Sequence, residues 1–177
     1  MPDAEPPRPS LPALLRREIA DVFAGRESDR PWELPFAIAL AAGLPMLVGA
    51  LIGQAGFGAI ASIGAMTIVY LPRTRLDLRM VAVMSAACAM MACYALGQIG
   101  HVLPAARVPL IAAVALLVTM GCRYYRVGPP GPLFFVMTAS IGAYAPGTLA
   151  DLPQHLGVFA LGALGAVCIA FFYSLHI

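Results

Sequence analysis

The stretch Met80–Gly100, MVAVMSAACAMMACYALGQIG, decides the fold class of this chain. It contains no Asp, Glu, Lys or Arg over 21 consecutive residues, and about 20 apolar residues are enough for a helix to cross the hydrocarbon core of a bilayer. A helix packed on a soluble core would normally carry charged side chains on its exposed face. The stretch is therefore predicted to be a transmembrane helix.

The rest of the chain repeats this pattern. Hydrophobic residues make up 60% of the sequence and charged residues 11%, whereas a typical soluble domain carries about 25% charged residues. The predicted spans are Pro35–Gly53, Phe57–Leu71, Met80–Gly100, Val108–Gly121, Pro132–Ala145 and Leu156–Tyr173. The second, fourth and fifth are short for a full crossing, so we expect them to be tilted, broken or extended by flanking polar residues. The predicted fold class is all-α, a polytopic membrane protein of six transmembrane helices.

The chain before the first span differs from the rest. Residues 1–10 are polar and rich in proline, and we expect them to be disordered. In residues 11–30 the apolar side chains fall on one helical face, which predicts an amphipathic interfacial helix. These side chains are Leu14, Leu15, Ile19, Val22 and Phe23. Residues 31–177 are assigned to the membrane domain.

The basic residues predict the orientation in the membrane. All 11 are arginines, and ten of them precede the first span or lie between spans two and three or four and five. Arg107 alone falls on the opposite side. Because an excess of Arg and Lys marks cytoplasmic loops, both termini are predicted to be cytoplasmic. The net charge of +2 is too small to indicate a nucleic-acid partner.

An internal repeat predicts the architecture. The tract Ala61–Ala65, ASIGA, recurs as Ala139–Ala143, 78 residues later. Carrying this offset onward without a gap places the third span on the sixth, so the repeating units are three spans each, at about 31–100 and 105–177. Two copies of an odd number of spans enter the membrane with opposite orientations, which is the inverted-repeat plan of many secondary transporters. A five-residue match between apolar helices can also arise by chance, and that alternative stays open.

The second and fifth spans are the predicted site of function. Both are short and interrupted by Gly or Pro, a pattern that points to a ligand site between them. The free N–H groups and positive end of a broken helix suit an anion. The residues expected to bind substrate are Ser62, Thr67, Phe134, Phe135, Thr138 and Ser140, and those expected to gate an outer vestibule are Gln54, Gln98 and His101. The alternatives are that the glycines serve close helix packing and that the hydroxyls bond within the helix bundle.

Other chemistry is not indicated. The sequence contains no catalytic or phosphate-binding motif, so the chain is not expected to be an enzyme or to need a cofactor. The cysteines follow no metal or redox spacing and are interpreted as small buried hydrophobic residues. They are Cys88, Cys93, Cys122 and Cys168. His155 is interpreted as an ordinary surface residue of an outer loop.

Two motifs resemble a known family. The first is the Gly-rich second span from Gly58 that leads into Leu71-Pro72-Arg73-Thr74-Arg75 and an Ala/Gly-rich third span. The second is Pro129-Pro130-Gly131-Pro132-Leu133-Phe134-Phe135 at the start of the fifth span. With them the chain resembles the membrane half of the fusaric acid resistance family, which includes the aromatic acid exporters, over most of residues 34–173. The resemblance implies efflux of aromatic or other hydrophobic carboxylates across a bacterial inner membrane, sometimes with a periplasmic adaptor.

The resemblance also raises the question of completeness. Family members commonly carry a cytoplasmic domain after six spans, whereas this sequence stops at Ile177, either as a piece of a longer protein or as a minimal member. Since one copy looks too small for a complete pathway, we expect a homo-oligomer. The expected function is an oligomeric transporter or channel for small organic anions. The alternative is a membrane scaffold that anchors a cytoplasmic domain or partner and transports nothing.

Overall fold

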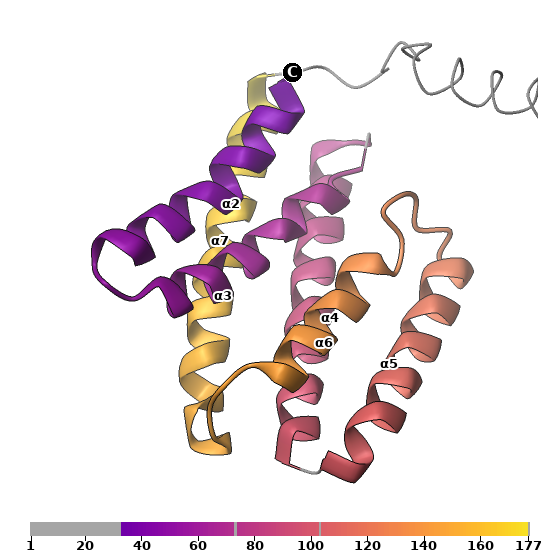
Figure 1. The fold of residues 1–177 in the computed structure, drawn as a ribbon. Coiled ribbons are helices and arrows are strands. Elements are labelled where there is room, and N and C mark those ends of the chain that lie inside the picture. Colours follow the sequence, from indigo (N-terminus) through magenta and orange to yellow (C-terminus); the bar gives the residue numbers. More distant parts are fainter. Residues whose placement is uncertain (1–32, 73, 103, 177) are drawn as a thin grey trace, which may run out of the picture. The chain divides into compact units, whose positions relative to one another are not determined.

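The computed structural model describes residues 33–72, 74–102 and 104–176. The predicted disordered tail (1–10) and interfacial helix (11–30) lie outside these residues. The described part is helical and contains no strand. Its α-helices are α2 (Glu33–Leu51), α3 (Ala55–Ala65), α4 (Leu76–Val102), α5 (Pro104–Tyr124), α6 (Leu133–Tyr144) and α7 (Leu152–His176), with 3-10 helices η1 (Met66–Tyr70) and η2 (Leu149–Asp151) (Figure 1).

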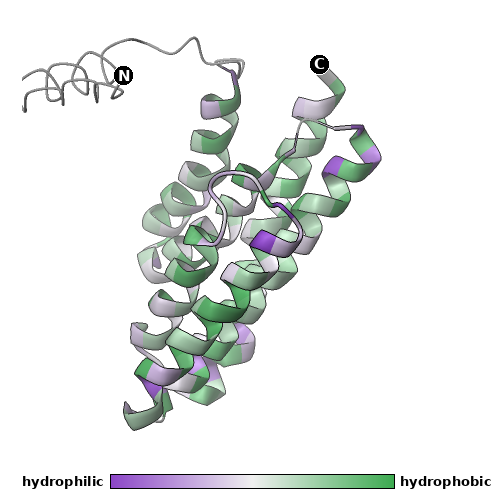
Figure 2. Cartoon of the chain, turned by 90° about the vertical axis from the view of Figure 1, so that its right-hand side faces the viewer, coloured by the Kyte–Doolittle hydropathy of each residue, from purple (hydrophilic) through white to green (hydrophobic). Residues whose placement is uncertain are grey.

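Four of these elements are long and apolar enough to cross a membrane. Within the described residues they are Glu33–Leu51, Leu76–Val102, Pro104–Tyr124 and Leu149–Leu175. Most hydrophilic residues lie at helix ends and in loops (Figure 2), and large apolar side chains such as Leu117 on α5 and Phe172 on α7 are more than half exposed. An exposed apolar surface of this extent suits lipid rather than water. The chain is a membrane protein.

The two shorter apolar helices are Ala55–Tyr70 and Leu133–Tyr144, which are the second and fifth predicted spans. The fourth predicted span is not short, which corrects the expectation from the sequence. It forms the 21-residue helix α5, because Pro104 suits a first helical position and the helix continues through Arg107 and Arg123 beyond the apolar tract.

Each short helix packs on a long one, α3 on α7 and α6 on α4 (Figure 1). The crossings bring backbone onto backbone at glycines. A methyl group on Gly64 would strike the carbonyl of Phe159, and one on Gly142 would lie 2.5 Å from the carbonyl oxygen of Tyr94. The long helices also contribute glycines to these contacts. Gly162 of α7 lies against the Ala61 carbonyl of α3, and Gly97 of α4 lies against the Ala139 carbonyl of α6.

The two crossings use equivalent residues. Gly64 and Gly142 stand at the same place in the repeated ASIGA tract, 78 residues apart. Their partners lie in a second repeated tract, YALG at 94–97 and FALG at 159–162, which is 65 residues apart. The ungapped offset of 78 is therefore the wrong register for the third and sixth spans, because the link between short and long helix is longer in the first half.

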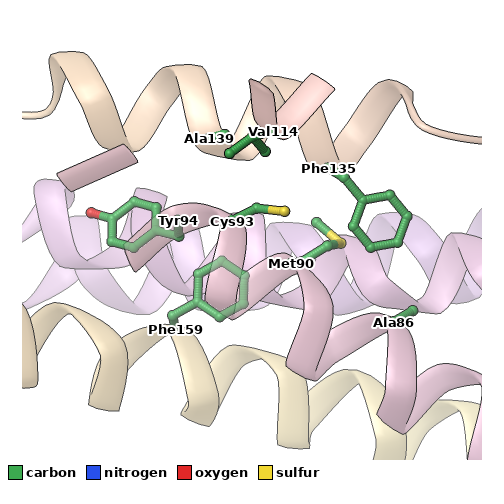
Figure 3. Packing of buried hydrophobic residues seen from close by; sticks show 8 residues of the cluster. All are labelled: Ala86, Met90, Cys93, Tyr94, Val114, Phe135, Ala139 and Phe159. Atoms are coloured by element: carbon green, nitrogen blue, oxygen red, sulfur yellow. The ribbon is translucent and has the colours of Figure 1, made fainter. Parts of the chain in front are cut away.

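A core cluster joins α4, α5, α6 and α7. Its members are Ala86, Met90, Cys93, Tyr94, Val114, Phe135, Ala139 and Phe159 (Figure 3). The rings of Tyr94 and Phe159, which occupy equivalent positions in the two crossings, stack with centroids 5.7 Å apart and planes 33° apart. Cys93 is buried here, but Cys88 and Cys168 are exposed. The expectation of four buried cysteines is wrong for those two, because they lie on outward faces of α4 and α7.

We predict that Gly162→Ala lowers the free energy of unfolding by about 1–3 kcal/mol, because overpacking forces the crossing helices apart. Gly165→Ala on the same helix is the matched control, since its added methyl would have no neighbour within 4 Å. Thermal unfolding of the purified protein in detergent measures the difference. Equal melting temperatures for the two variants would contradict the close crossing.

Candidate functional site

Two apolar pockets lie along α4 and α6. The first, called the Tyr70 pocket, has a volume of about 530 Å³, and its lining residues include Tyr70, Ala86, Ala89, Cys122, Tyr125 and Phe135. The second, called the His155 pocket, has a volume of about 600 Å³, and its lining residues include Gln54, Phe57, Ile60, Tyr94, Ile141 and His155. Both volumes fall in the range of about 300–1,000 Å³ that is typical of small-molecule sites.

Only a thin layer of packed side chains separates the pockets. Ala89 lines the Tyr70 pocket and Tyr94 lines the His155 pocket, and five residues of helix correspond to about 7.5 Å. In Figure 3, Phe135 and Tyr94 lie at opposite ends of the core cluster, with Met90 and Cys93 between them. Met90 and Cys93 are buried. We call this layer the septum.

A buried polar network lies at the wall of the His155 pocket. Gln98 Nε2 donates a hydrogen bond to Tyr94 Oη at 3.1 Å and lies 3.1 Å from His155 Nδ1. The imidazole is 8% exposed and its ring meets the ring of Phe57 edge-on, with centroids 6.0 Å apart. Buried polar groups in a membrane protein need partners within the protein unless they line a water-filled cavity. Gln98 is the shared partner here.

Helix α7 brings His155 to this wall. Thr148 and Asp151 form a capping box before the helix, in which the Thr148 amide and Oγ1 both donate to Asp151 Oδ2, at 2.8 and 2.9 Å. The chain is helical from Leu152, so His155 lies on the same helix face as Phe159, one turn before it. His155 is therefore buried on a helix, and its interpretation as a surface loop residue is wrong.

The predicted substrate hydroxyls bond elsewhere or stay buried. Ser62 Oγ donates to the Ala42 carbonyl at 2.6 Å. Thr138 and Ser140 donate to carbonyls one turn earlier on their own helix, at 2.6 and 2.9 Å. Thr67 Oγ1 is buried and has no hydrogen-bond partner among the described residues. None of these hydroxyls lines the Tyr70 or His155 pocket.

The predicted aromatic residues meet Tyr70. Its ring centroid lies 4.9 Å from that of Phe135 and 6.4 Å from that of Phe134, and its hydroxyl donates to the Gly131 carbonyl at 2.6 Å. Phe135 lines the Tyr70 pocket, whereas Phe134 does not line it. Of the six predicted substrate residues, Phe135 alone therefore faces one of these two pockets.

The three predicted gating residues divide differently. Gln54 lines the His155 pocket and Gln98 holds its buried network. His101 lies apart from both, with Nδ1 3.1 Å from the Ala143 carbonyl oxygen, and its own carbonyl accepts a bond from Arg107 at 3.2 Å. No group of three His, Cys, Asp or Glu side chains among the described residues could hold a metal ion.

Tyr94 and His155 were not predicted as site residues. The sequence does contain a signal for them, because Tyr94 precedes Gln98 by four residues and His155 precedes Phe159 by four. Residues four apart share a helix face. The YALG and FALG tracts place Tyr94 and Phe159 on the packed faces of their helices, and with them Gln98 and His155.

We predict that Gln98→Leu lowers the free energy of unfolding by about 1–3 kcal/mol, because Tyr94 and His155 lose a shared buried partner. Gln154→Leu, which removes an exposed amide on α7, should change it little. Chemical denaturation in detergent micelles provides the comparison. A Gln98→Leu protein as stable as the control would show that the network does not stabilise the bundle.

The chain is similar to a membrane protein of Bacillus subtilis. It is 27% identical over 155 residues to the "Uncharacterized membrane protein YvaC" of Bacillus subtilis (strain 168), a match that covers 86% of this chain and 24% of that protein. The chain thus spans about a quarter of the length of that relative. No family model matches it, and no solved structure matches it. This similarity agrees with the helices in identifying a membrane protein.

Proposed function

We propose that the chain is the membrane unit of an oligomeric transporter or channel for small organic anions, which exports aromatic or other hydrophobic carboxylates across a bacterial inner membrane. The observation that carries the proposal is the pair of apolar pockets on either side of the septum. A site that is open on one side of a thin barrier at a time is what alternating access requires. The pockets are large enough for a substituted aromatic acid.

The equivalent helix crossings support the inverted-repeat part of the proposal. If the chain consists of two three-span halves, 31–100 and 105–177, then α6 is the counterpart of α3 and α7 is the counterpart of α4. The contacts of Gly64 and Gly97 with their partners match those of Gly142 and Gly162 residue by residue. Chance similarity of two apolar tracts gives no reason for such a match.

The two motifs that resemble the fusaric acid resistance family also meet in space. Tyr70 lies at the end of the Gly-rich second span, and its hydroxyl binds Gly131 of the Pro/Gly-rich entry to the fifth. Its ring contacts Phe135 of the same entry. We propose membership of that family on this basis, and with it a homo-oligomer. The periplasmic adaptor, the absence of enzyme activity and the absence of a cofactor stay expectations from the sequence.

The second candidate is a membrane scaffold that anchors a cytoplasmic domain or partner. The close packing of the bundle favours it, because the glycines at the two crossings admit no side chain between the helices and the septum residues Met90 and Cys93 are buried. The two candidates differ in whether the septum opens. A measurement of benzoate flux through the protein distinguishes the transporter from the scaffold.

On orientation, we predict six crossings with both termini in the cytoplasm, from the distribution of arginines. Single cysteines at positions 74 and 127 should be protected from an impermeant maleimide added to intact cells, and those at 105 and 150 should be labelled. The native cysteines are replaced by Ala beforehand, because Cys88 and Cys168 are exposed. The reverse pattern of labelling would overturn the orientation.

On transport, we predict that proteoliposomes with wild-type protein release labelled benzoate faster than empty vesicles. Ala89→Trp should slow the release, because the indole would fill the Tyr70 pocket that Ala89 lines. Ala113→Trp, at an exposed position of α5 outside both pockets, is the matched control. Wild-type release no faster than that of empty vesicles would favour the scaffold.

A further inference from the structure

The His155 pocket combines apolar walls with hydrogen-bond donors for which the described residues offer no acceptor. Phe57, Ile60, Ile63 and Ile141 provide the walls. We propose that this pocket binds an organic acid with an apolar body. Its carboxylate group is held by Tyr94, His155 and the N-terminus of α3. This inference rests on the proposed function in organic anion transport. It assigns a second binding site to the transporter, in addition to the Tyr70 pocket.

The Gln98 network determines which groups remain free to donate. A glutamine Nε2 carries two hydrogens. One is donated to Tyr94 Oη. Because an amide nitrogen cannot accept, we infer that the other is donated to His155 Nδ1, 3.1 Å away, and that the imidazole proton lies on Nε2. Tyr94 then has its own hydroxyl hydrogen left to donate, and His155 has its Nε2–H. Both side chains are buried and line the pocket.

The first turn of α3 adds backbone donors to the same wall. The residues Gln54, Ala55, Gly56 and Phe57 all line the pocket. The Gln54 side chain does not cap the helix, and the first turn has no acidic residue. The helix ladder begins at Gly58, whose amide donates to the Gln54 carbonyl at 3.1 Å. The three preceding amides therefore have no acceptor among the described residues, and they form the positive end of the helix dipole.

Two charged side chains lie near this end of the bundle. Asp151, one turn before His155, disfavours an anion, although its Oδ2 already accepts two bonds from Thr148. Arg107 favours an anion, and its guanidinium lies 4.9 Å from the ring centroid of Tyr144, next to the pocket residue Ala145. The neutral donors at the wall therefore provide the specific contacts, and Asp151→Asn should tighten binding.

Position 94 permits a conservative test. Its equivalent in the second crossing is Phe159, whose ring is fully buried, so Tyr94→Phe keeps a ring that this packing accepts and removes only the hydroxyl. His155→Asn keeps an amide oxygen near the place of Nδ1 to accept from Gln98 and removes the Nε2–H donor. Neither change alters the α3 N-terminus.

The experiment measures equilibrium binding of labelled benzoate to the purified full chain in detergent, with benzyl alcohol as the uncharged probe. Tyr94→Phe and His155→Asn should each weaken benzoate binding about tenfold, as expected for one hydrogen bond to an ionised group. Benzyl alcohol binding should not change. Cooperative thermal unfolding and retained binding of benzyl alcohol show that the variants are folded, since Tyr94→Phe also removes an acceptor of Gln98 and should lower the melting temperature somewhat.

Three results would overturn the site: no saturable binding of benzoate by the wild type, wild-type affinity for benzoate in both variants, or displacement of benzoate by short-chain phosphatidylglycerol at lower concentration than by benzoate itself. The last result would assign the pocket to a lipid headgroup. Tyr94-dependent binding without flux would overturn transport and keep the site. Flux of benzoate that is unaffected by both variants would keep transport and remove the site.

Discussion

Direct contact between helix backbones at glycines holds this bundle together. In lipid the apolar side chains gain little by leaving their surroundings, so helices associate through close packing and interhelical polar contacts. Gly64, Gly97, Gly142 and Gly162 allow each short helix to lie against the carbonyl groups of a long one. Glycines of the same helices that face away, such as Gly157 and Gly165, have no neighbour within 4 Å. Position in the crossing, and not glycine content, therefore determines the fold.

The same crossings determine where polar groups can lie. Tyr94 provides the carbonyl against which Gly142 packs, and its side chain reaches Gln98 and the His155 pocket. A rigid crossing thus fixes the position of a hydroxyl at the wall of that pocket. The hydroxyls of Thr138, which is fully buried, and of Ser140 bond instead to carbonyls of their own helix.

The sequence predicts the helices of this protein better than its site. An uncharged stretch such as Met80–Gly100 has few alternatives to a membrane helix, and it lies within α4. The pattern does not fix which hydroxyls face a cavity, because Ser62 bonds to α2 and Thr138 to its own turn. His155 was misread because its burial depends on where α7 begins. The capping box of Thr148 and Asp151 begins the 3-10 helix η2, which leads directly into α7, and this short-range signal is not part of the apolar pattern.

The two halves share their packing but differ in chemistry. With a shift of 65 residues, Tyr94 and Gln98 correspond to Phe159 and Ala163, and His155 corresponds to Met90. All three counterparts are buried and apolar. The septum therefore has a polar face toward the His155 pocket and an apolar face on the opposite side. A scaffold needs only the packing that the two halves share. The difference in side chains between the halves places every buried hydrogen bond between side chains, among the described residues, on one side of the septum. An anion that crosses would thus meet fixed donors on one side and apolar wall on the other.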